Sequence, residues 1–423
     1  MLSLWPMLKR IKHFWNSLGP GLVTGIANND SSAVLIYALA GARFGLAPLW
    51  VLLYILPFMI AIQSMCARIG ALSGCGLAGN IRKYYSPWLL VPAVASIVVV
   101  NTINVGADIS GMAGAINLLI PISSWIIAVL LAVFVVGMVI FLRYDMIEKI
   151  FKWLALTLLA YGVALILVEP NWGAILQNLL VPSIQNSKIF WLTMFAMVGT
   201  TLSPYMYFWQ ANHETEDLRN GYSPVRVCKF RPVSRSIISG IDLDTRVGMI
   251  ASNVISVFIL ALTAHTIHLM GSGDIQTLRD AASALEPLAG PYAYPLFVFG
   301  MIGSGILAIP VLAGSAAYAL SEMFGWRASI DVPFNRAPAF YTIMAASVAV
   351  GLIIPFVGIT PVQALFWSGV LGGMATPFLI ALVVHMARNK NIVGTNRVPI
   401  PLHILGVGAF LMMITGSLYV IFA

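Results

Sequence analysis

Apolar residues occur in runs of about 20 along almost the whole chain, and short polar gaps separate the runs. A helix of about 20 residues crosses a hydrocarbon core of roughly 30 Å. The pattern therefore predicts eleven membrane-spanning helices, over residues 16–42, 46–70, 88–114, 122–142, 151–169, 189–212, 247–270, 292–322, 338–356, 361–387 and 402–422.

Two of these helices contain a polar interruption near mid-depth, at residues 25–32 and 199–204. Pro204 removes a backbone donor and clashes with the preceding turn, while Asn, Asp and Ser side chains compete for backbone groups. Broken helices at matching positions of two halves are typical of inverted-repeat transporters. We therefore expect an all-α polytopic membrane protein with two five-helix repeats, about 16–169 and 189–387, and an extra helix at 402–422.

The composition agrees with a membrane protein that uses residues 1–423 as one transmembrane domain. Hydrophobic residues make up 60% of the chain and charged residues 9%, with a mean hydropathy of +0.92, whereas soluble domains carry roughly 25% charged residues. The net charge of +8 does not indicate nucleic-acid binding, because the Lys and Arg lie in the gaps and not on an amphipathic face. The lipid bilayer is the expected surrounding.

The distribution of basic residues predicts the orientation. If the N-terminus, with Lys9, Arg10 and Lys12, lies in the cytoplasm, then 20 of the 23 Lys and Arg residues fall on that side. Positive charge gathers in cytoplasmic loops, so we expect a plasma-membrane protein with its C-terminus outside and an uncleaved first helix. The longest polar gap, 213–246, is expected to be a basic cytoplasmic loop near anionic lipid.

Cysteine and histidine patterns argue against several other chemistries. The three cysteines, Cys66, Cys75 and Cys228, are odd in number and lack CxxC spacing, which predicts neither a disulfide framework nor a structural zinc site. The six histidines show no HExxH or similar spacing, and nothing suggests a bound cofactor. We therefore do not expect an enzyme.

Asp30 is the main candidate site residue. A carboxylate at the bilayer centre costs on the order of 3 kcal/mol unless it is paired or hydrated, and no Lys or Arg lies near it in sequence or in the second broken helix. A cation is its natural partner, since broken helices also free carbonyl oxygens, which bind hard ions. The alternative is that Asp30 caps its own broken helix. Asn28 and Asn29 are expected to break the helix, with Asn29 a secondary ligand.

Several segments together resemble one family. They are Gly19-Pro20-Gly21 before the first break, the sequence GTTLSPY at 199–205, NTINVGAD at 101–108 and PVLAGSAAYALSE at 310–322. Along nearly the whole chain the sequence resembles the Nramp family of divalent metal transporters, and most closely its magnesium-transporting branch. The resemblance implies a LeuT-like fold with the ion between the two broken helices.

The resemblance also implies a ligand set. Asp30 matches the family's metal-binding Asp, and Ala27 and Thr200 match positions that offer carbonyl oxygens, with Thr201 beside them as a secondary candidate. Ala33 replaces the family's Asn and Ser203 its Met. A thioether favours transition metals, and Mg²⁺ usually keeps several waters. A wider, oxygen-lined pocket therefore suits Mg²⁺, with Mn²⁺ also accepted.

A second set of differences concerns protons. Proton-coupled members have a His where this chain has Tyr205 and a Glu where it has Gly111, although Asp108 remains. Ion transport without proton coupling is the expected consequence. The alternative to a proton-carrying role for Asp108 is a structural hydrogen bond between helices. This chain also has Ser31 where the family usually has a Pro after the metal-binding Asp, which changes the shape of the first break.

The acidic residues after the second broken helix have two interpretations. Glu214 and Glu216, together with Asp217, are either a solvated helix end or an acidic exit that attracts the cation.

Rival functions are a proton-coupled Mn²⁺ or Fe²⁺ importer, a LeuT-fold amino-acid transporter, a membrane enzyme and a scaffold. An amino-acid site would present helix N-termini to a substrate carboxylate and would not place a bare carboxylate there. The sequence does not set the oligomeric state, and a monomer is the simplest expectation.

Overall fold

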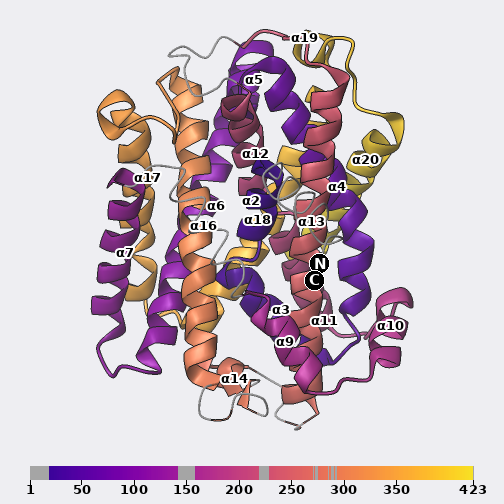
Figure 1. Ribbon diagram of the computed structural model, residues 1–423, viewed down its shortest axis with the longest axis vertical. Helices are drawn as coiled ribbons and strands as arrows, with labels where there is room; N and C mark the ends of the chain where they lie inside the picture. The colour runs from indigo at the N-terminus through magenta and orange to yellow at the C-terminus, as the bar shows by residue number, and fades with distance from the viewer. Residues whose placement is uncertain are drawn as a thin grey trace, which may run out of the picture.

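The computed structural model describes residues 19–141, 158–218, 228–269, 271, 275–283, 285–286, 290 and 293–422, and within them it contains helices and no strands. Figure 1 shows a bundle of long helices running between two ends, with α5 and α19 at one end and α14 at the other. In the described residues nine helical segments are long and apolar enough to cross a membrane.

Every predicted span corresponds to a helix or helix pair in the described part of the chain. The first and sixth are pairs, α2 (Pro20–Ala27) with α3 (Ser31–Phe44), and α11 (Lys188–Thr201) with α12 (Pro204–Asp217). The other spans are α4 (Leu49–Ser73), α6 (Pro87–Asn117), α7 (Ser124–Phe141), α9 (Ala160–Leu167), α13 (Arg235–Thr263, continued by a π-helical turn Ala264–His268), α16 (Ala293–Phe324), α17 (Pro338–Gly351), α18 (Pro361–Met386) and α20 (Ile400–Phe422).

Short helices connect these spans. They are α5 (Leu77–Tyr84), α10 (Trp172–Leu180), α14 (Leu278–Ser283) and α19 (Lys390–Val393), with 3₁₀ turns at Phe334–Arg336 and Ile354–Phe356. The basic start of the chain (Lys9, Arg10 and Lys12) and the first part of the predicted fifth span lie outside the described residues.

The predicted loop over 213–246 is wrong at both ends. Helix α12 runs on to Asp217, and α13 begins at Arg235, well before the apolar run. Ser234 caps α13 by accepting the Ile237 N–H at 3.4 Å, and Ile238 and Ile241 bury one face of the extension. Amphipathic spacing in a charged segment therefore continues the helix beyond the hydrocarbon-length run.

The two broken helices occupy the core, and less buried helices surround them. Helix α2 packs mainly on α13, and α3 packs on α13, α18 and α11. Helices α7, α17 and α20 lie at the edges of the bundle (Figure 1) and expose large apolar side chains such as Phe134 and Leu411. An apolar exterior around a polar interior is the arrangement that a bilayer requires.

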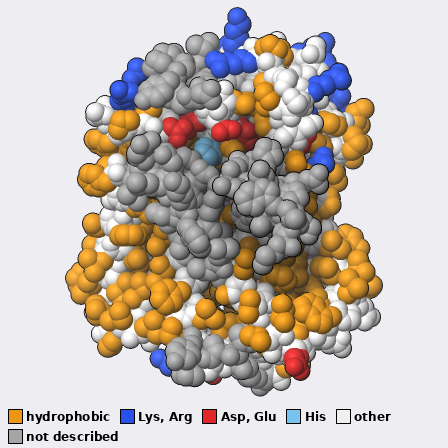
Figure 2. All heavy atoms as spheres, in the orientation of Figure 1, with side chains coloured by type: hydrophobic (Ala, Val, Ile, Leu, Met, Phe, Trp, Pro, Cys, Tyr) orange, Lys and Arg blue, Asp and Glu red, His pale blue; other side chains and the backbone are white. Residues whose placement is uncertain are grey.

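The end that carries α5 and α19 is the basic end of the molecule. Arg82 and Lys83 on α5 and Lys390 on α19 are exposed there, and Figure 2 shows Lys and Arg side chains gathered at this end above flanks of apolar side chains. The charge asymmetry predicted from the sequence therefore has a spatial counterpart among the described residues.

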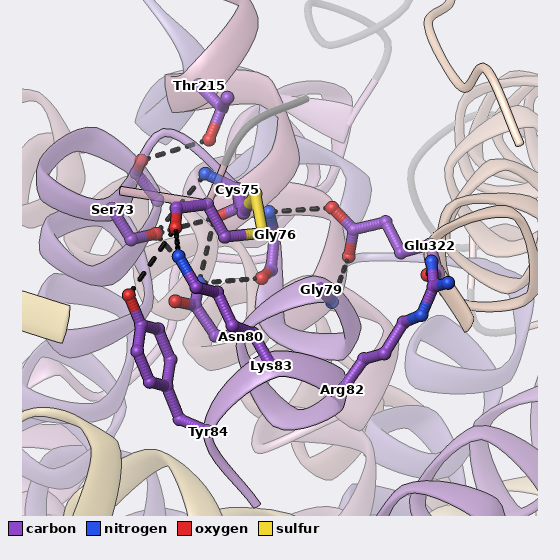
Figure 3. The surroundings of a disulfide bond; sticks show 12 residues. Ser73, Cys75, Gly76, Gly79, Asn80, Arg82, Lys83, Tyr84, Thr215 and Glu322 are labelled. Atoms are coloured by element: carbon purple, nitrogen blue, oxygen red, sulfur yellow. Dashed lines mark hydrogen bonds between the residues drawn. A yellow bond between two sulfur atoms is a disulfide. The ribbon is translucent and has the colours of Figure 1, made fainter. Parts of the chain in front are cut away.

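A disulfide joins Cys75 to Cys228 at the basic end (Figure 3), a cross-link that the sequence, from which no disulfide framework is expected, does not predict. The chain segment at 228–231 pairs with the end of α4, because the Lys229 and Arg231 N–H groups donate to the Ser73 and Leu72 carbonyls at 3.0 and 2.7 Å. This pairing brings the two cysteine Cα atoms to 5.2 Å across 153 residues of sequence. Cysteine spacing along the chain carries no trace of such a contact.

The disulfide can be tested by peptide mapping. When the purified protein is alkylated without reduction and digested, we expect the Cys75 and Cys228 peptides to be recovered as one cross-linked species, and the buried Cys66 as an unlinked peptide. A reduced and alkylated sample is the control. Recovery of Cys75 and Cys228 as separately alkylated peptides from the unreduced sample would show that the pair is not oxidised.

Candidate functional site

The first helix break is centred on Asp30, which begins a new helix. The side chain of Asp30 accepts the Ala33 N–H at 2.7 Å and so caps α3. Only 1% of Asp30 is exposed, and the neighbouring Ala27 and Ser31 are equally buried. The capping role considered for Asp30 is therefore present, and the charge it brings lies sealed inside the bundle.

The two asparagines before Asp30 attach the break to α13. The Asn28 and Asn29 amides donate to the Ser252 hydroxyl at 3.1 and 3.0 Å, and Ser256 donates to the Asn29 side-chain oxygen at 3.2 Å. These contacts give Asn29 an anchoring role in this conformer. The Asn28 Oδ1 atom is buried without a hydrogen-bond partner in the described part of the chain, so the pocket retains an acceptor that a bound group can satisfy.

The second break supplies hydroxyl groups that meet the freed carbonyls. Tyr205 donates its hydroxyl to the Ala27 carbonyl at 3.0 Å, and Ser203 donates to the Thr200 carbonyl at 2.6 Å. Both carbonyls predicted as ligands therefore carry a hydroxyl partner in place of a helical N–H. The Thr201 hydroxyl is committed elsewhere, since it donates to the Met197 carbonyl at 2.6 Å and pairs with Tyr37 at 2.8 Å.

A second carboxylate lies behind the first break. Ser32 donates to Asp108 Oδ1 at 3.3 Å and pairs with the Ser368 hydroxyl at 2.8 Å. Asp108 is fully buried and within electrostatic range of Asp30, and its Oδ2 atom is without a hydrogen-bond partner among the described residues. The bond between α3 and α6 matches the structural role considered for Asp108.

The surroundings of Gly111 and Ala33 are closely packed. A Cβ atom on Gly111 would lie 2.9 Å from Leu365 Cδ1 and 3.2 Å from Met301 Cε, so apolar side chains fill the place where the resemblance leads one to expect a Glu. Ala33 is completely buried. In the described chain no three His, Cys, Asp or Glu side chains gather in a metal-binding cluster, which leaves the breaks with isolated carboxylates, carbonyls and hydroxyls.

One interpretation of the acidic end of α12 was a solvated helix end, and the burial of its two glutamates contradicts it. Glu214 is 1% exposed and accepts a hydrogen bond from Gln210 at 2.9 Å, and Glu216 is buried against the Tyr318 hydroxyl at 2.9 Å. Asp217 is exposed. Figure 2 shows acidic side chains and a histidine in a group just below the basic end.

Sequence reasoning missed Asp244 on α13. Its carboxylate accepts the N–H groups of Gly19, Gly21 and Leu22 at 3.0, 2.6 and 3.2 Å, and so caps the start of α2. We predicted a loop over 213–246, and a carboxylate in a solvated loop is expected to face water, so nothing pointed to a contact with another helix. The buried Ile238 and Ile241, read as one helical face, are the signal that could have placed it.

Comparison with known proteins identifies the family. The model of the Natural resistance-associated macrophage protein-like (Nramp) family matches residues 21–423. The chain is 27% identical over 412 residues to a protein named divalent metal cation transporter MntH from Ralstonia nicotianae, covering 93% of this chain and 86% of that protein. A protein of the same name from Klebsiella pneumoniae is 25% identical over 388 residues, with 89% and 86% covered.

Solved structures share the fold. The manganese transporter of Eremococcus coleocola superposes with a TM-score of 0.73 at 16% identity, over 96% of this chain and 86% of that one. Mhp1, a nucleobase-cation-symport-1 family transporter, superposes with a TM-score of 0.54 at 15% identity, over 95% and 92%. The broken-helix architecture is therefore LeuT-like, and the chain belongs to the Nramp family.

Proposed function

We propose that this protein transports a divalent metal cation, Mg²⁺ with Mn²⁺ also accepted, through the site between the two helix breaks. The observation that carries the proposal is a buried contact between the two breaks, in which the Tyr205 hydroxyl bonds the Ala27 carbonyl just before Asp30. The Thr200 carbonyl of the second break is likewise met by a hydroxyl. The relatives named as divalent metal cation transporters support the substrate class.

The pocket offers ligands of the type that hard cations bind. A cation that enters displaces the hydroxyl groups of Ser203 and Tyr205, which keep their protons and turn away. The Thr200 and Ala27 carbonyls then change from hydrogen-bond acceptors into metal ligands. The hydroxyl oxygens stay close enough to hold metal-bound waters. Carboxylate, carbonyl and water oxygens are the ligands that Mg²⁺ and Mn²⁺ share.

The preference for Mg²⁺ follows from what the pocket lacks. Ser203 and Ala33 stand where the resemblance places a thioether and an amide, so the pocket has no soft ligand at these positions. Their side chains are smaller than the Met and Asn that the resemblance places there, so a site that opens for the ion can admit it with more of its water, which suits an ion that dehydrates reluctantly. Resemblance to the magnesium-transporting branch supports the same choice over a Mn²⁺- or Fe²⁺-selective importer.

Transport without proton coupling follows from the groups around Asp108. Gly111 sits among apolar side chains, and Tyr205 offers only a phenol, a group whose pKa in water is about 10 and which does not exchange protons readily at neutral pH. The membrane potential then drives the cation inward. We place the basic end in the cytoplasm of a cell whose plasma membrane holds the protein, with the N-terminus inside and the C-terminus outside.

The first test separates the capping role of Asp30 from ion binding. Asp30→Asn keeps an oxygen that can accept the Ala33 N–H and removes the charge, whereas Asp30→Ala removes both. We expect each variant to lower Mg²⁺ and Mn²⁺ uptake into proteoliposomes by at least about 100-fold, the scale of losing a charged ligand, with only Asp30→Ala clearly lowering the melting temperature. Near-normal uptake by folded Asp30→Asn would exclude Asp30 as the ligand.

The second test restores the missing ligands. The double variant Ser203→Met, Ala33→Asn introduces a thioether and an amide, and we expect Mn²⁺ to be favoured over Mg²⁺ by about tenfold more than in the parent, because soft ligands favour transition metals. Competition between Mg²⁺ and radioactive Mn²⁺ in proteoliposomes measures the change. Ser203→Leu with Ala33→Leu is the size-matched control without a ligand atom, and equal competition in parent and double variant would contradict this account of selectivity.

The third test concerns protons. With a pH-sensitive dye inside proteoliposomes and a fixed inside-negative potential, we expect Mg²⁺ or Mn²⁺ uptake without acidification of the lumen beyond the leak of empty liposomes. Uptake should rise with the potential, because each ion carries two charges inward. Inward proton flux that requires the metal would instead make the protein a proton-coupled importer, with Asp30 or Asp108 as the proton carrier.

A further inference from the structure

The half-helix α2 is held at the basic end mainly by a single neighbour, α13. It packs mainly on that helix, with smaller contacts to α12 and α16. The crossing is close, because a Cβ atom on Gly25 would lie 2.2 Å from the Gly248 carbonyl oxygen and one on Gly248 would lie 2.1 Å from the Gly21 carbonyl oxygen. Two backbones at this distance leave no room for a side chain between them.

Asp244 supplies the polar part of the same contact. Its carboxylate accepts three N–H groups from the first turn of α2, and the residue is 6% exposed. The N-terminus of a helix carries partial positive charge and unpaired N–H groups, so a buried carboxylate there makes charge-assisted hydrogen bonds, which are stronger than neutral ones. The N-cap residue of α2, Gly19, contributes no side-chain cap of its own.

The position of this contact connects it to ion release. Helix α2 ends at Ala27, the residue whose carbonyl is a proposed ligand, and Asp30 follows directly after the break. Thr24, Asp30 and Ser203 are at most 3% exposed, so the site is closed to solvent in this structure. Since α2 lies between the basic end and the site, a path from the site must open beside it.

We propose that Asp244 is the latch of the gate at the basic end, a positioning residue that keeps α2 on α13 while the site is closed and releases it when the site opens. The inference extends the proposed transport function, but it concerns the equilibrium between closed and open forms and not the identity of the ion. Asp217 and Glu214 lie within electrostatic range of Asp244, so a divalent cation passing them would weaken the pull of the carboxylate on the helix.

The test reports the opening of α2 directly. Thr24, buried in the middle of α2, is replaced by Cys, and its alkylation by a maleimide is followed in purified protein in nanodiscs by peptide mapping, which separates it from the native cysteines. We expect Asp244→Asn to raise the alkylation rate of Thr24→Cys about tenfold, the scale of one hydrogen bond to a charged group. The measurement requires no ion and no transport.

A matched control lies two residues away on the same helix. Asp242 pairs with Arg68 of α4 and makes no hydrogen bond to α2 among the described contacts. Asp242→Asn removes the same charge from the same helix but breaks a mostly buried pair that joins α13 to α4 and not to α2. We therefore expect the Thr24→Cys rate to stay close to that of the parent. An unchanged rate in folded Asp244→Asn, or an equal rise in Asp242→Asn, overturns the latch.

Two further results keep the inference falsifiable. If Asp244→Asn does not fold, Asp244→Ser takes its place with the same expected rise, and failure of both variants to fold makes Asp244 a folding requirement and not a latch. In uptake assays a released latch lowers the share of molecules open to the outside, so the KM for external Mg²⁺ should rise in proportion. If no variant or parent moves any metal, the proposed function fails while the alkylation result still decides the latch.

Discussion

The structure depends on the requirement that every backbone polar group inside a bilayer find a partner within the protein. An unbroken helix meets this requirement by itself, but two helices in the core are interrupted, because α2 stops at Ala27 and α11 stops at Thr201. The groups left free are met by side chains: Asp30 caps α3, and hydroxyls from α12 meet the Ala27 and Thr200 carbonyls. The candidate site is therefore the set of groups that repairs the two breaks.

This origin explains why the site and its packing cannot be separated. Asn28 and Asn29 fix the first break to Ser252 and Ser256 of α13, and the half-helix before it lies against the same α13. Any motion that opens the site must therefore change contacts along one helix face. Buried polar networks of this kind have few alternative arrangements. Two helices in close backbone contact cannot slide apart gradually, so they are either packed or separated.

The sequence predicts the spans, the two breaks and Asp30, because these depend on local properties: hydrophobic length, a proline, and a charge that needs a partner. It does not predict contacts between distant segments. The Cys75–Cys228 disulfide and the Asp244 cap join residues more than 150 positions apart, and nothing in their own spacing indicates the pairing. The early start of α13 lies between these cases, since the buried Ile238 and Ile241 carry a helical period that the neighbouring charges obscure. Ligand roles at Ala27 and Thr200 rest on backbone atoms, which side-chain chemistry cannot reveal.

The hydroxyl partners of the two carbonyls link ion binding to helix position. Tyr205 at the start of α12 bonds the last residue of α2, so it bridges both breaks. In the proposed transport, a cation that binds the Ala27 carbonyl replaces this bridge with bonds of its own, and the energy of the exchange depends on whether α2 stays in place. Since Asp244 holds the other end of the same eight-residue helix, the ion and the carboxylate act on one rigid element from opposite ends. A ligand shifts such an equilibrium only by the difference in its affinity for the two positions, and a carbonyl at the end of the moving helix provides that difference directly.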